Sequence, residues 1–186
     1  MIPEFTKGNI CFFNFTDLDE PTLTQILEWR NNASIRVMMN NTEMIALQNH
    51  LNFVEKLKDN KHSIYWLVSR KNKSCGVVYF HSNIDEPNCA EWGYYLAPHF
   101  LGTGIGFEVG FEAIHIFFKH LGITTLTGFV KHSNLENRRI QEGLGFAEDS
   151  SSSDLVSLKL CIDSYRTLPQ DFLTFQKQIF YGRKTL

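Results

Sequence analysis

The sequence predicts a single domain of the α/β class, in its α+β form, with helices flanking a central sheet. Segments typical of strands and helices alternate along most of the 186 residues, with no internal repeat and no interdomain linker. Hydrophobic residues make up 43% of the chain, which is enough for a full core. A glycine-rich segment between a strand-like run and a helix-like run gives the first indication of function.

The first half of the chain predicts one strand, two helices and three further strands. Ile10 to Phe15 is a short apolar run that suits a strand. The sequence Asp-Glu-Pro-Thr at 19–22 resembles a helix start with proline in the first turn, and the helical pattern continues to Arg30. A second helix is expected over 47–58. The three strands are expected at 64–69, 75–81 and 90–96, with turns at 71–73 and 85–88.

After the glycine-rich segment, the pattern predicts a helix, a strand, a second helix and a second strand. The helix over 105–121 has basic residues in its last turn and ends at Gly122, which can take the left-handed conformation. A β-branched run at 124–130 is typical of a buried strand, and Asn134 can cap a helix over 135–143. We expect a polar loop at 150–154, a strand at 155–162 and an amphipathic terminal helix within 169–181.

The glycine-rich segment, Pro98 to Gly106, predicts a phosphate-binding loop. Its glycines let main-chain N–H groups approach an anion without interference from side chains, and the following helix adds about half a positive charge at its N-terminus. A pyrophosphate is the expected ligand. The alternative is a tight turn that only allows close helix packing. The Gly-x-Gly-x-Gly spacing is not the dinucleotide-binding fingerprint, and no Gly-Lys-Ser/Thr follows it.

Composition and charge exclude several classes of partner. The formal net charge is −2 and there is no long basic run, so we expect no nucleic-acid partner. Four cysteines without paired spacing indicate reduced thiols in a cytoplasm, and neither they nor the seven dispersed histidines suggest a metal site. The sequence shows no signal peptide pattern and no apolar run of membrane-spanning length, so we expect a cytoplasmic protein without a membrane partner.

Two motifs give the chain a family resemblance. The loop has the form Leu-Gly-x-Gly-x-Gly at 101–106, and Asn134 is followed at the family's spacing by Gly145-Phe146. Together they resemble the motifs of the GNAT N-acetyltransferase superfamily, and the resemblance covers residues 8–162. It implies a mixed and mostly antiparallel sheet whose fourth and fifth strands splay apart. Residues 163–186 are expected to form a helical tail that packs on the same domain.

The resemblance implies that acetyl-CoA is the cofactor, as the acetyl donor. The end of the fourth strand would bind the pantetheine arm like an added strand, through Leu96, Ala97 and Pro98. Asn134 would contact that arm from the opposite wall. The diphosphate would bind the loop formed by Leu101, Gly102, Thr103, Gly104, Ile105 and Gly106.

Leu101 departs from the family pattern, because a polar or basic residue is usual at that position. Diphosphate binding would then depend more on main-chain donors. Arg138, together with Lys131 and Arg139, could add positive charge nearby. The alternative for the two arginines is an exposed helix face.

Proton transfer is the second departure. Gln141 stands where many family members carry a tyrosine that protonates the leaving thiolate, and glutamine cannot act as that acid. Water, His132 or another group would supply the proton, or the thiolate leaves unprotonated. Glu91 is the first candidate for the base that accepts the amine proton, because aromatic neighbours could raise its pKa, and His81 is the second. The alternatives are an ion-paired carboxylate and an ordinary strand-end histidine.

Two short motifs in the N-terminal third indicate the acceptor. Trp-Arg-Asn at 29–31 and His-Leu-x-Phe at 50–53 resemble nucleotide-linked amino-sugar N-acetyltransferases of the pseudaminic acid pathway. The resemblance implies a small-molecule amine, with the arginine on a nucleotide phosphate, the histidine hydrogen-bonded to the acceptor and tryptophans against the base or the sugar. The alternatives are a core tryptophan, a helix-capping arginine and a surface histidine. The implied acceptor-binding residues are Trp29, Arg30, Asn31, His50 and Trp92.

Two other functions stay open beside N-acetyl transfer to a nucleotide sugar. Acetyltransferases of protein N-termini share a Trp-Arg-like opening and a Trp-Gly-Tyr fourth strand, so the acceptor could be a peptide or another small amine. Because Gln141 replaces the tyrosine, the chain could also be a non-catalytic acyl-CoA-binding module. The sequence is compatible with a homodimer.

Overall fold

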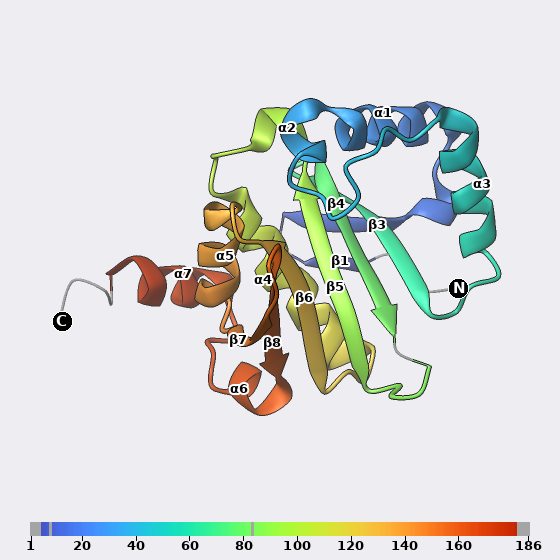
Figure 1. Ribbon diagram of the computed structural model, residues 1–186. Coiled ribbons are helices and arrows are strands. Elements are labelled where there is room, and N and C mark those ends of the chain that lie inside the picture. Colours follow the sequence, from blue (N-terminus) through green and yellow to red (C-terminus); the bar gives the residue numbers. More distant parts are fainter. Residues whose placement is uncertain (1–4, 8, 83, 182–186) are drawn as a thin grey trace.

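An eight-stranded mixed sheet lies at the centre of the structure, a computed structural model that describes residues 5–7, 9–82 and 84–181 (Figure 1). The strands lie in the order β1-β2-β3-β4-β5-β6-β8-β7, and β5 and β6 are parallel while the other neighbours are antiparallel. The prediction of a mixed, mostly antiparallel sheet is therefore confirmed. The strands are β1 Phe5–Lys7, β2 Ile10–Asn14, β3 Ser63–Arg70, β4 Lys73–Ser82, β5 Cys89–Leu96, β6 Thr125–Lys131, β7 Ala147–Ser151 and β8 Leu155–Cys161.

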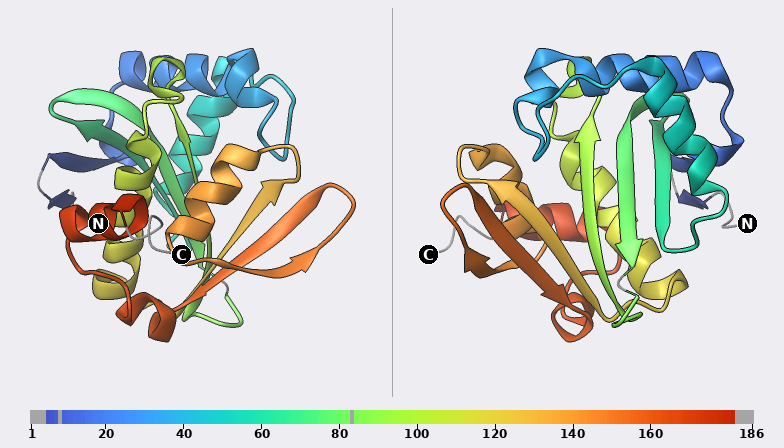
Figure 2. Two further views of the ribbon diagram at one scale, coloured as in Figure 1. Left: turned by 90° about the vertical axis from the view of Figure 1, so that its left-hand side faces the viewer. Right: turned by 45° about the vertical axis from the view of Figure 1, so that its right-hand side comes forward.

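Helices cover both faces of the sheet. Helices α1, α2 and α3 lie on one side, and α4 covers the other side with α5 and α7 beside it (Figures 1 and 2). No helix of the described residues is both long and apolar enough to cross a membrane. The helices are α1 Glu20–Asn31, α2 Ala33–Arg36, α3 Leu47–Leu57, α4 Ile105–His120, α5 Leu135–Gly143, α6 Ile162–Arg166 and α7 Phe172–Tyr181, with short 3-10 turns at Phe15–Asp17 and Pro98–Phe100.

Burial on both faces explains the long apolar runs of the central strands. Successive strand residues point to opposite faces. On β3, Trp66 packs in the larger core, where its ring stacks on Phe117 of α4 at 5.8 Å. Its neighbour Leu67 belongs to the second core, beneath α1 and α3, with Ile26 and Val54. The sheet thus separates two hydrophobic layers, of which the second supports the candidate site.

The terminal helices α6 and α7 pack on the larger core. Phe175 of α7 is 1% exposed, and its ring centroid lies 4.8 Å from that of Phe111 on α4. The hydroxyl of Tyr165 on α6 lies 2.6 Å from Nδ1 of His115, also on α4. Residues beyond β8 therefore share the core formed by the sheet and α4.

The structure confirms the predicted strands and helices and corrects one loop. The segment 150–154 is not entirely a loop, because β7 continues to Ser151 and pairs with β8. All residues of β7 are exposed, so no apolar alternation marks it. The elements β1, α2 and α6 were not predicted, since segments of 3, 4 and 5 residues are too short to show a periodic pattern.

Strands β5 and β6 separate within the sheet. They are the fourth and fifth strands of the predicted order, which lacked β1, so the separation that the resemblance implied is present. Their register joins Cys89–Glu91 to Thr125–Thr127, and no further backbone pair joins them along the described chain. Each strand keeps its other neighbour, since β5 pairs with β4 as far as Leu96 and β6 pairs with β8 as far as Lys131. The two strands consequently form a V (Figure 2), which we call the gap.

Trp92 fills the base of the gap. It is 1% exposed and stacks on Tyr94 and Phe146 at centroid distances of 5.6 and 5.5 Å. The facing residue on β6 is Gly128, where a Cβ atom would lie 3.4 Å from the indole nitrogen. Glycine at this position leaves room for the large ring, which supports the two strands where they separate.

Replacing Gly76 with alanine should destabilise the sheet next to the gap. An added Cβ at Gly76 would lie 2.5 Å from the carbonyl oxygen of Tyr95 on β5, so β4 and β5 would have to move apart. We expect the free energy of unfolding, measured by urea titration, to fall by about 1–3 kcal/mol. Gly128→Ala is the matched control, because its closest neighbour would be at 3.4 Å. Equal stability of the two variants would contradict this account of the packing.

Candidate active site

A cavity of about 450 Å³ opens at the gap and extends beneath α1 and α3. It is lined from both faces of the sheet, because Tyr79 and Tyr95 point to one side and Tyr94 and Trp92 to the other. Its walls combine aromatic rings with side-chain amides. The aromatic residues are Phe15, Phe53, Tyr65, Tyr79, Trp92, Tyr94, Tyr95 and Phe129, and the polar ones are Arg30, Asn40, Asn41, Asn49, His50, Asn134, Asn137 and Gln141.

A second cavity of about 170 Å³ connects the first to the glycine-rich loop. Leu101 and Gly102 line its outer end. Six residues line both cavities, so the two meet between β5, α5 and the segment after α2. These shared residues are Met38, Met39, Tyr94, Tyr95, Asn134 and Asn137. The result is a continuous path from the loop, through the gap, to the aromatic cavity.

The segment 37–46, which we call the strap, crosses over this path between α2 and α3. Arg30 donates from Nη2 to the carbonyl oxygen of Asn41 at 2.6 Å, and Arg36 donates from Nη1 to that of Thr42 at 2.7 Å. On the other side of the gap, Lys131 of β6 donates from Nζ to the carbonyl oxygen of Val37 at 3.0 Å. Hydrogen bonds from both walls therefore hold the strap above the gap.

Asn31 positions the strap and is not among the residues that line the cavity, so its expected contact with the acceptor stays a prediction. Its side-chain nitrogen donates to the carbonyl oxygen of Ile45 at 2.8 Å, and its side-chain oxygen accepts from the Ile45 N–H at 2.9 Å. Both polar atoms of the amide are thus used by the main chain. Trp29 is also outside the cavity, because it is buried in the core beneath α1 with Phe15 and Ile26. The core alternative for Trp29 is the one that the structure supports.

Arg30, which the sequence predicts to bind the acceptor, lies in the cavity wall. Its Nη1 atom is buried and has no hydrogen-bond partner among the described residues, while Nη2 is held by the strap. Burial lowers the pKa of Arg30, although a guanidinium stays protonated in proteins. A half-buried guanidinium with a buried and unpartnered N–H group is suited to bind an anion through a charge-assisted hydrogen bond.

His50 lines the same cavity from α3 and is buried, which excludes the surface alternative. Its ring stacks on Phe53 at a centroid distance of 6.5 Å, and Nε2 has no partner among the residues that the structure describes. Burial lowers the pKa of His50 and therefore favours the neutral ring. A neutral imidazole can donate or accept one hydrogen bond at this nitrogen, according to its tautomer.

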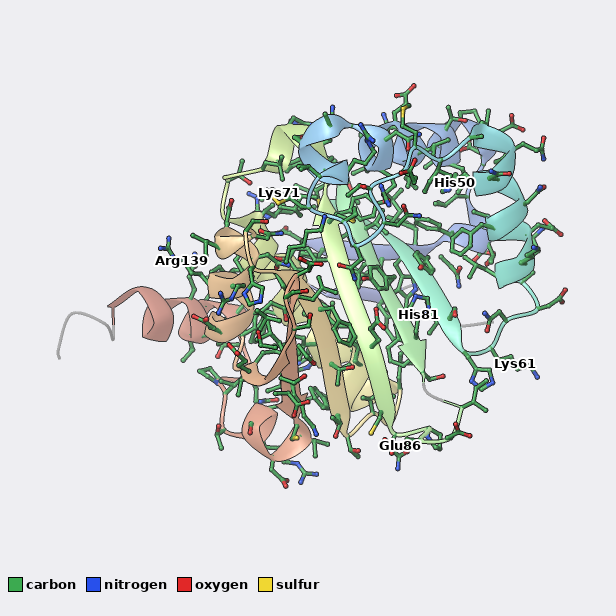
Figure 3. The ribbon with its side chains drawn as sticks, in the orientation of Figure 1. His50, Lys61, Lys71, His81, Glu86 and Arg139 are labelled. Carbon is green, nitrogen blue, oxygen red and sulfur yellow. The ribbon has the colours of Figure 1, made fainter. Side chains whose placement is uncertain are left out.

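Glu91 and His81 lie behind the tyrosine wall of the cavity. They face each other in the register of β5 and β4 and share a face with Tyr65 and Tyr79. The Nε2 atom of His81 is 3.1 Å from the hydroxyl of Tyr65, and its Nδ1 atom is 2.9 Å from Oγ of Ser63 (Figure 3 labels His81). Burial raises the pKa of Glu91 and lowers that of His81. A hydrogen-bonded tyrosine thus separates His81 from the cavity.

Tyr65 and Tyr79 were not selected from the sequence. Their rings stack at a centroid distance of 5.4 Å, and the side chain of Tyr79 covers the place where a Cβ of Gly93 would lie. Alternate tyrosines on neighbouring strands also fit an ordinary core. Only the register that pairs Tyr65 with Tyr79 and Tyr79 with Gly93 brings them to the cavity.

The glycine-rich loop begins α4 with an exposed turn. Gly102 and Gly104 have φ angles of +70° and +79°, and nothing lies within 4 Å of an added Cβ at either position. Gly104 is the N-cap of α4, so the N–H groups of Ile105 and Gly106 belong to the unpaired first turn. Thr103 is tied within the turn, since its Oγ1 donates to the carbonyl oxygen of Phe100 at 2.7 Å. This geometry fits an anion held by main-chain donors.

The path along β5 lies closer to the middle of the strand than the sequence predicted. Leu96 lines the second cavity, but the N–H of Ala97 donates to the carbonyl oxygen of Cys75 at 2.9 Å, and Pro98 has no N–H. Tyr94 and Tyr95 line both cavities. The β5 residues that line the cavities toward the loop are therefore Tyr94, Tyr95 and Leu96, and contacts of Ala97 and Pro98 with the cofactor stay predictions.

The other wall is a row of amides on α5. Asn134 caps this helix by accepting the N–H of Asn137 at 3.2 Å, and both residues line the two cavities. Gln141 follows on the same helix face and lines the larger cavity but not the second one. The positions 134, 137 and 141 have the spacing of neighbours on one helix face, and this signal could have identified Asn137 from the sequence.

The cationic residues near α5 are less available to bind a diphosphate than the sequence suggested. Arg138 lies with Nη2 3.6 Å from the Glu148 carboxylate, although its buried Nε has no partner among the described residues. Arg139 is exposed on the outer side of α5 (Figure 3). Lys131 is used to hold the strap. Among these groups, the main-chain donors of the loop are therefore the most available to an anion at this end of the path.

Comparisons with known proteins agree with this geometry. A sequence model of the acetyltransferase (GNAT) domain family matches residues 14–147. The chain is also 29% identical to the acetyltransferase PseH of Campylobacter jejuni subsp. jejuni serotype O:23/36 (strain 81-176) over 156 residues, which are 84% of this chain and 96% of that protein.

Solved structures extend the similarity to three dimensions. The crystal structure of Campylobacter jejuni N-acetyltransferase PseH in complex with acetyl coenzyme A has a TM-score of 0.67 at 25% identity, over 82% of this chain and 98% of that chain. Spermidine N-acetyltransferase from Vibrio cholerae, in complex with CoA and spermine, has a TM-score of 0.77 at 16% identity, over 87% of this chain and 100% of that chain. At 16% identity the similarity shows the shared fold alone.

Replacing Glu91 with glutamine should change how stability depends on pH. Because burial raises the pKa of Glu91, the folded protein binds this proton more tightly than the unfolded chain. The stability contributed by this proton is present at low pH and is lost as the pH rises through the folded pKa. The free energy of unfolding of Glu91→Gln, relative to the original protein, should therefore increase from about pH 4 to about pH 8.

Urea titrations across that pH range measure the difference. The matched control is Glu28→Gln, because Glu28 is exposed on α1. A relative stability of Glu91→Gln that stays constant or falls as the pH rises would contradict a raised pKa for this half-buried carboxyl.

Proposed function

The chain belongs to the GNAT acetyltransferase family, and we propose that it transfers an acetyl group from acetyl-CoA to a primary amine on a nucleotide-linked sugar. The observation that carries the proposal is the continuous path from the glycine-rich loop to an aromatic cavity that contains Arg30. An elongated donor can occupy the first part of this path and a separate acceptor the second. The reacting groups would meet in the gap.

The residues along the first part of the path fit acetyl-CoA. The main-chain N–H groups at the start of α4 would hold its diphosphate. The edge of Tyr94–Leu96 that faces away from β4 and is not paired with β6 would pair with the amides of the pantetheine arm, and Asn134 and Asn137 would contact that arm from α5. When bound, acetyl-CoA supplies a thioester that an amine can attack. The similarity to PseH, which was crystallised in complex with acetyl coenzyme A, supports this assignment.

The second part of the path favours a nucleotide sugar as the acceptor. Arg30 presents a buried, unpartnered N–H group, which suits a phosphate of the nucleotide. The aromatic walls, including Phe53, Tyr65 and Tyr79, suit stacking on a base or a sugar. The similarity to PseH and the two motifs of the N-terminal third support the same class of acceptor.

Other acceptors fit the cavity less well. No carboxylate is among the described residues that line the larger cavity, so it offers no partner for the positive charges of a polyamine. The strap covers the path from above and is held from both sides, whereas a protein N-terminus requires an open groove. These two features argue against a polyamine and a peptide.

We assign proton removal from the amine to Glu91. Its raised pKa makes the carboxylate a stronger base than an exposed one. Because Glu91 lies behind the tyrosines, the proton would reach it through a water molecule or a tyrosine hydroxyl, with His81 as the second candidate. A cytoplasmic location and a homodimer stay predictions from the sequence.

Product analysis tests the proposed acceptor directly. The protein is incubated with acetyl-CoA and a panel of nucleotide-linked amino sugars, spermidine and short peptides, and the products are identified by mass spectrometry. We expect acetylation of a nucleotide-linked amino sugar, with CoA release that depends on the added amine. Acetylation of only a peptide or spermidine would contradict the proposed acceptor, and CoA binding without turnover on any amine would favour the non-catalytic module.

Arg30→Gln provides the matched variant for this experiment. Loss of a charge-assisted hydrogen bond should raise the KM for the nucleotide sugar by roughly 10- to 100-fold, while the affinity for CoA stays unchanged. Arg166→Gln is the control, since Arg166 is exposed on α6. An unchanged KM would remove Arg30 from the acceptor site.

Replacing Gly104 with valine should weaken CoA binding. Gly104 has a φ angle of +79°, which a β-branched residue adopts only with strain, so the main-chain donors at the start of α4 would turn away from the anion. Isothermal titration with CoA should show a loss of affinity of at least about tenfold. Gly122→Val is a closely matched control, because Gly122 has a φ of +68° and equally open surroundings at the other end of α4. Equal affinities of the two variants would exclude the loop from CoA binding.

A further inference from the structure

Gln141 is a buried amide at the deepest point of the donor path. The loop residue Gly102 lines the second cavity only, Asn134 and Asn137 line both cavities, and Gln141 lines the larger cavity only, with Arg30. Asn134 and Gln141 are separated by about 10 Å along α5. A donor that enters at the loop therefore reaches Gln141 last, where its reactive end would meet the acceptor.

Gln141 is buried, its side-chain oxygen lacks a partner in the described part of the chain and its side-chain nitrogen faces the gap at Gly128. The side chain is 2% exposed, and its oxygen has no hydrogen-bond partner among the described residues. A Cβ atom added at Gly128 would lie 3.6 Å from the side-chain nitrogen of Gln141. Because glycine has no Cβ, β6 does not cover this N–H group. The indole nitrogen of Trp92, 3.4 Å from the same point, is also buried without a partner. Buried polar groups are rarely left unpaired, which indicates that a ligand completes them.

The groups around Gln141 offer hydrogen bonds but little acidity. Its neighbours on the gap side of α5 are the neutral amides Asn134 and Asn137. Burial raises the pKa of Tyr79 to about 12 and raises that of Tyr94 as well. The titratable side chains that line the larger cavity are Arg30, His50, Tyr65, Tyr79, Tyr94 and Tyr95.

We propose that the Gln141 side-chain N–H donates a hydrogen bond to the sulfur of acetyl-CoA and stabilises the departing thiolate without protonating it. The proposal rests on the proposed function. In the reaction, the amine nitrogen bonds to the acetyl carbon, the carbon–sulfur bond breaks, and its electron pair stays on sulfur. The proton lost by the amine goes to Glu91. Gln141 keeps both of its protons, because a carboxamide cannot act as an acid at ordinary pH.

The thiol pKa of bound CoA tests this role without turnover. Hydrogen bonds to the charged form of a group lower its pKa. An ordinary thiol has a pKa of about 8.5, and the thiol of CoA bound to the original protein should have a pKa roughly one unit lower. The ultraviolet absorbance of the thiolate measures this value, with the complex of dethio-CoA as the reference that subtracts the protein's own cysteines.

Gln141→Met removes the N–H group while keeping a side chain of similar length. The thiol pKa of bound CoA should return to the value of free CoA or rise above it, and kcat should fall about tenfold with a smaller change in the KM for acetyl-CoA. Gln141→Leu serves as a second variant if the methionine protein does not fold. Gln25→Met, on the exposed face of α1, is the control and should leave the bound thiol unchanged.

The outcomes separate this role from the function on which it rests. Failure of the original protein to bind CoA would overturn the proposed function. Binding of CoA with the same thiol pKa in the original protein and in Gln141→Met would overturn the role of Gln141 and leave the acetyltransferase proposal in place. A lowered pKa that Gln141→Met abolishes supports both.

Discussion

The separation of β5 and β6 is the constraint on which the rest of the site depends. Both strands stay in the sheet through their outer neighbours, so their facing main chains lose partners only beyond Glu91 and Thr127. Unpaired strand edges inside a protein are costly unless a ligand or another chain pairs with them. Trp92 on β5 packs against Gly128 on β6 where the strands separate, and an added Cβ at Gly128 would lie in van der Waals contact with the indole ring, 3.4 Å from its nitrogen.

Side chains and main-chain segments form different sides of the gap. The amides on α5 form one wall, from Asn134 to Gln141, and the main chain of β5 forms the other. The strap closes the top through its bond with Lys131, and Arg30 supplies positive charge to the acceptor side. In the proposed reaction the donor and acceptor parts of the path meet in the gap, so positioning of the two reactants would contribute much of the catalysis.

The order of helices and strands could be predicted from the sequence, but only some of the residues that line the cavity could. Helix and strand periodicity, caps and turn residues are local signals, and the same holds for the glycine-rich loop. Arg30, His50, Trp92 and Asn134 were identified through motifs and do line the cavity. Tyr65 and Tyr79 depend on strand register, and the strap depends on long-range hydrogen bonds, neither of which a local pattern contains. Trp29 packs in the core and Asn31 pairs with the main chain of the strap, and a local motif does not distinguish these positions from acceptor contacts.

Hydrogen–deuterium exchange of the main chain, with and without CoA, tests the central claim most directly. If the pantetheine arm pairs with the open edge of β5, binding should slow exchange in Trp92–Leu96 and at the start of α4, and should leave the β6 edge paired with β8 unchanged. Slower exchange confined to other parts of the chain, with β5 unaffected, would contradict the account.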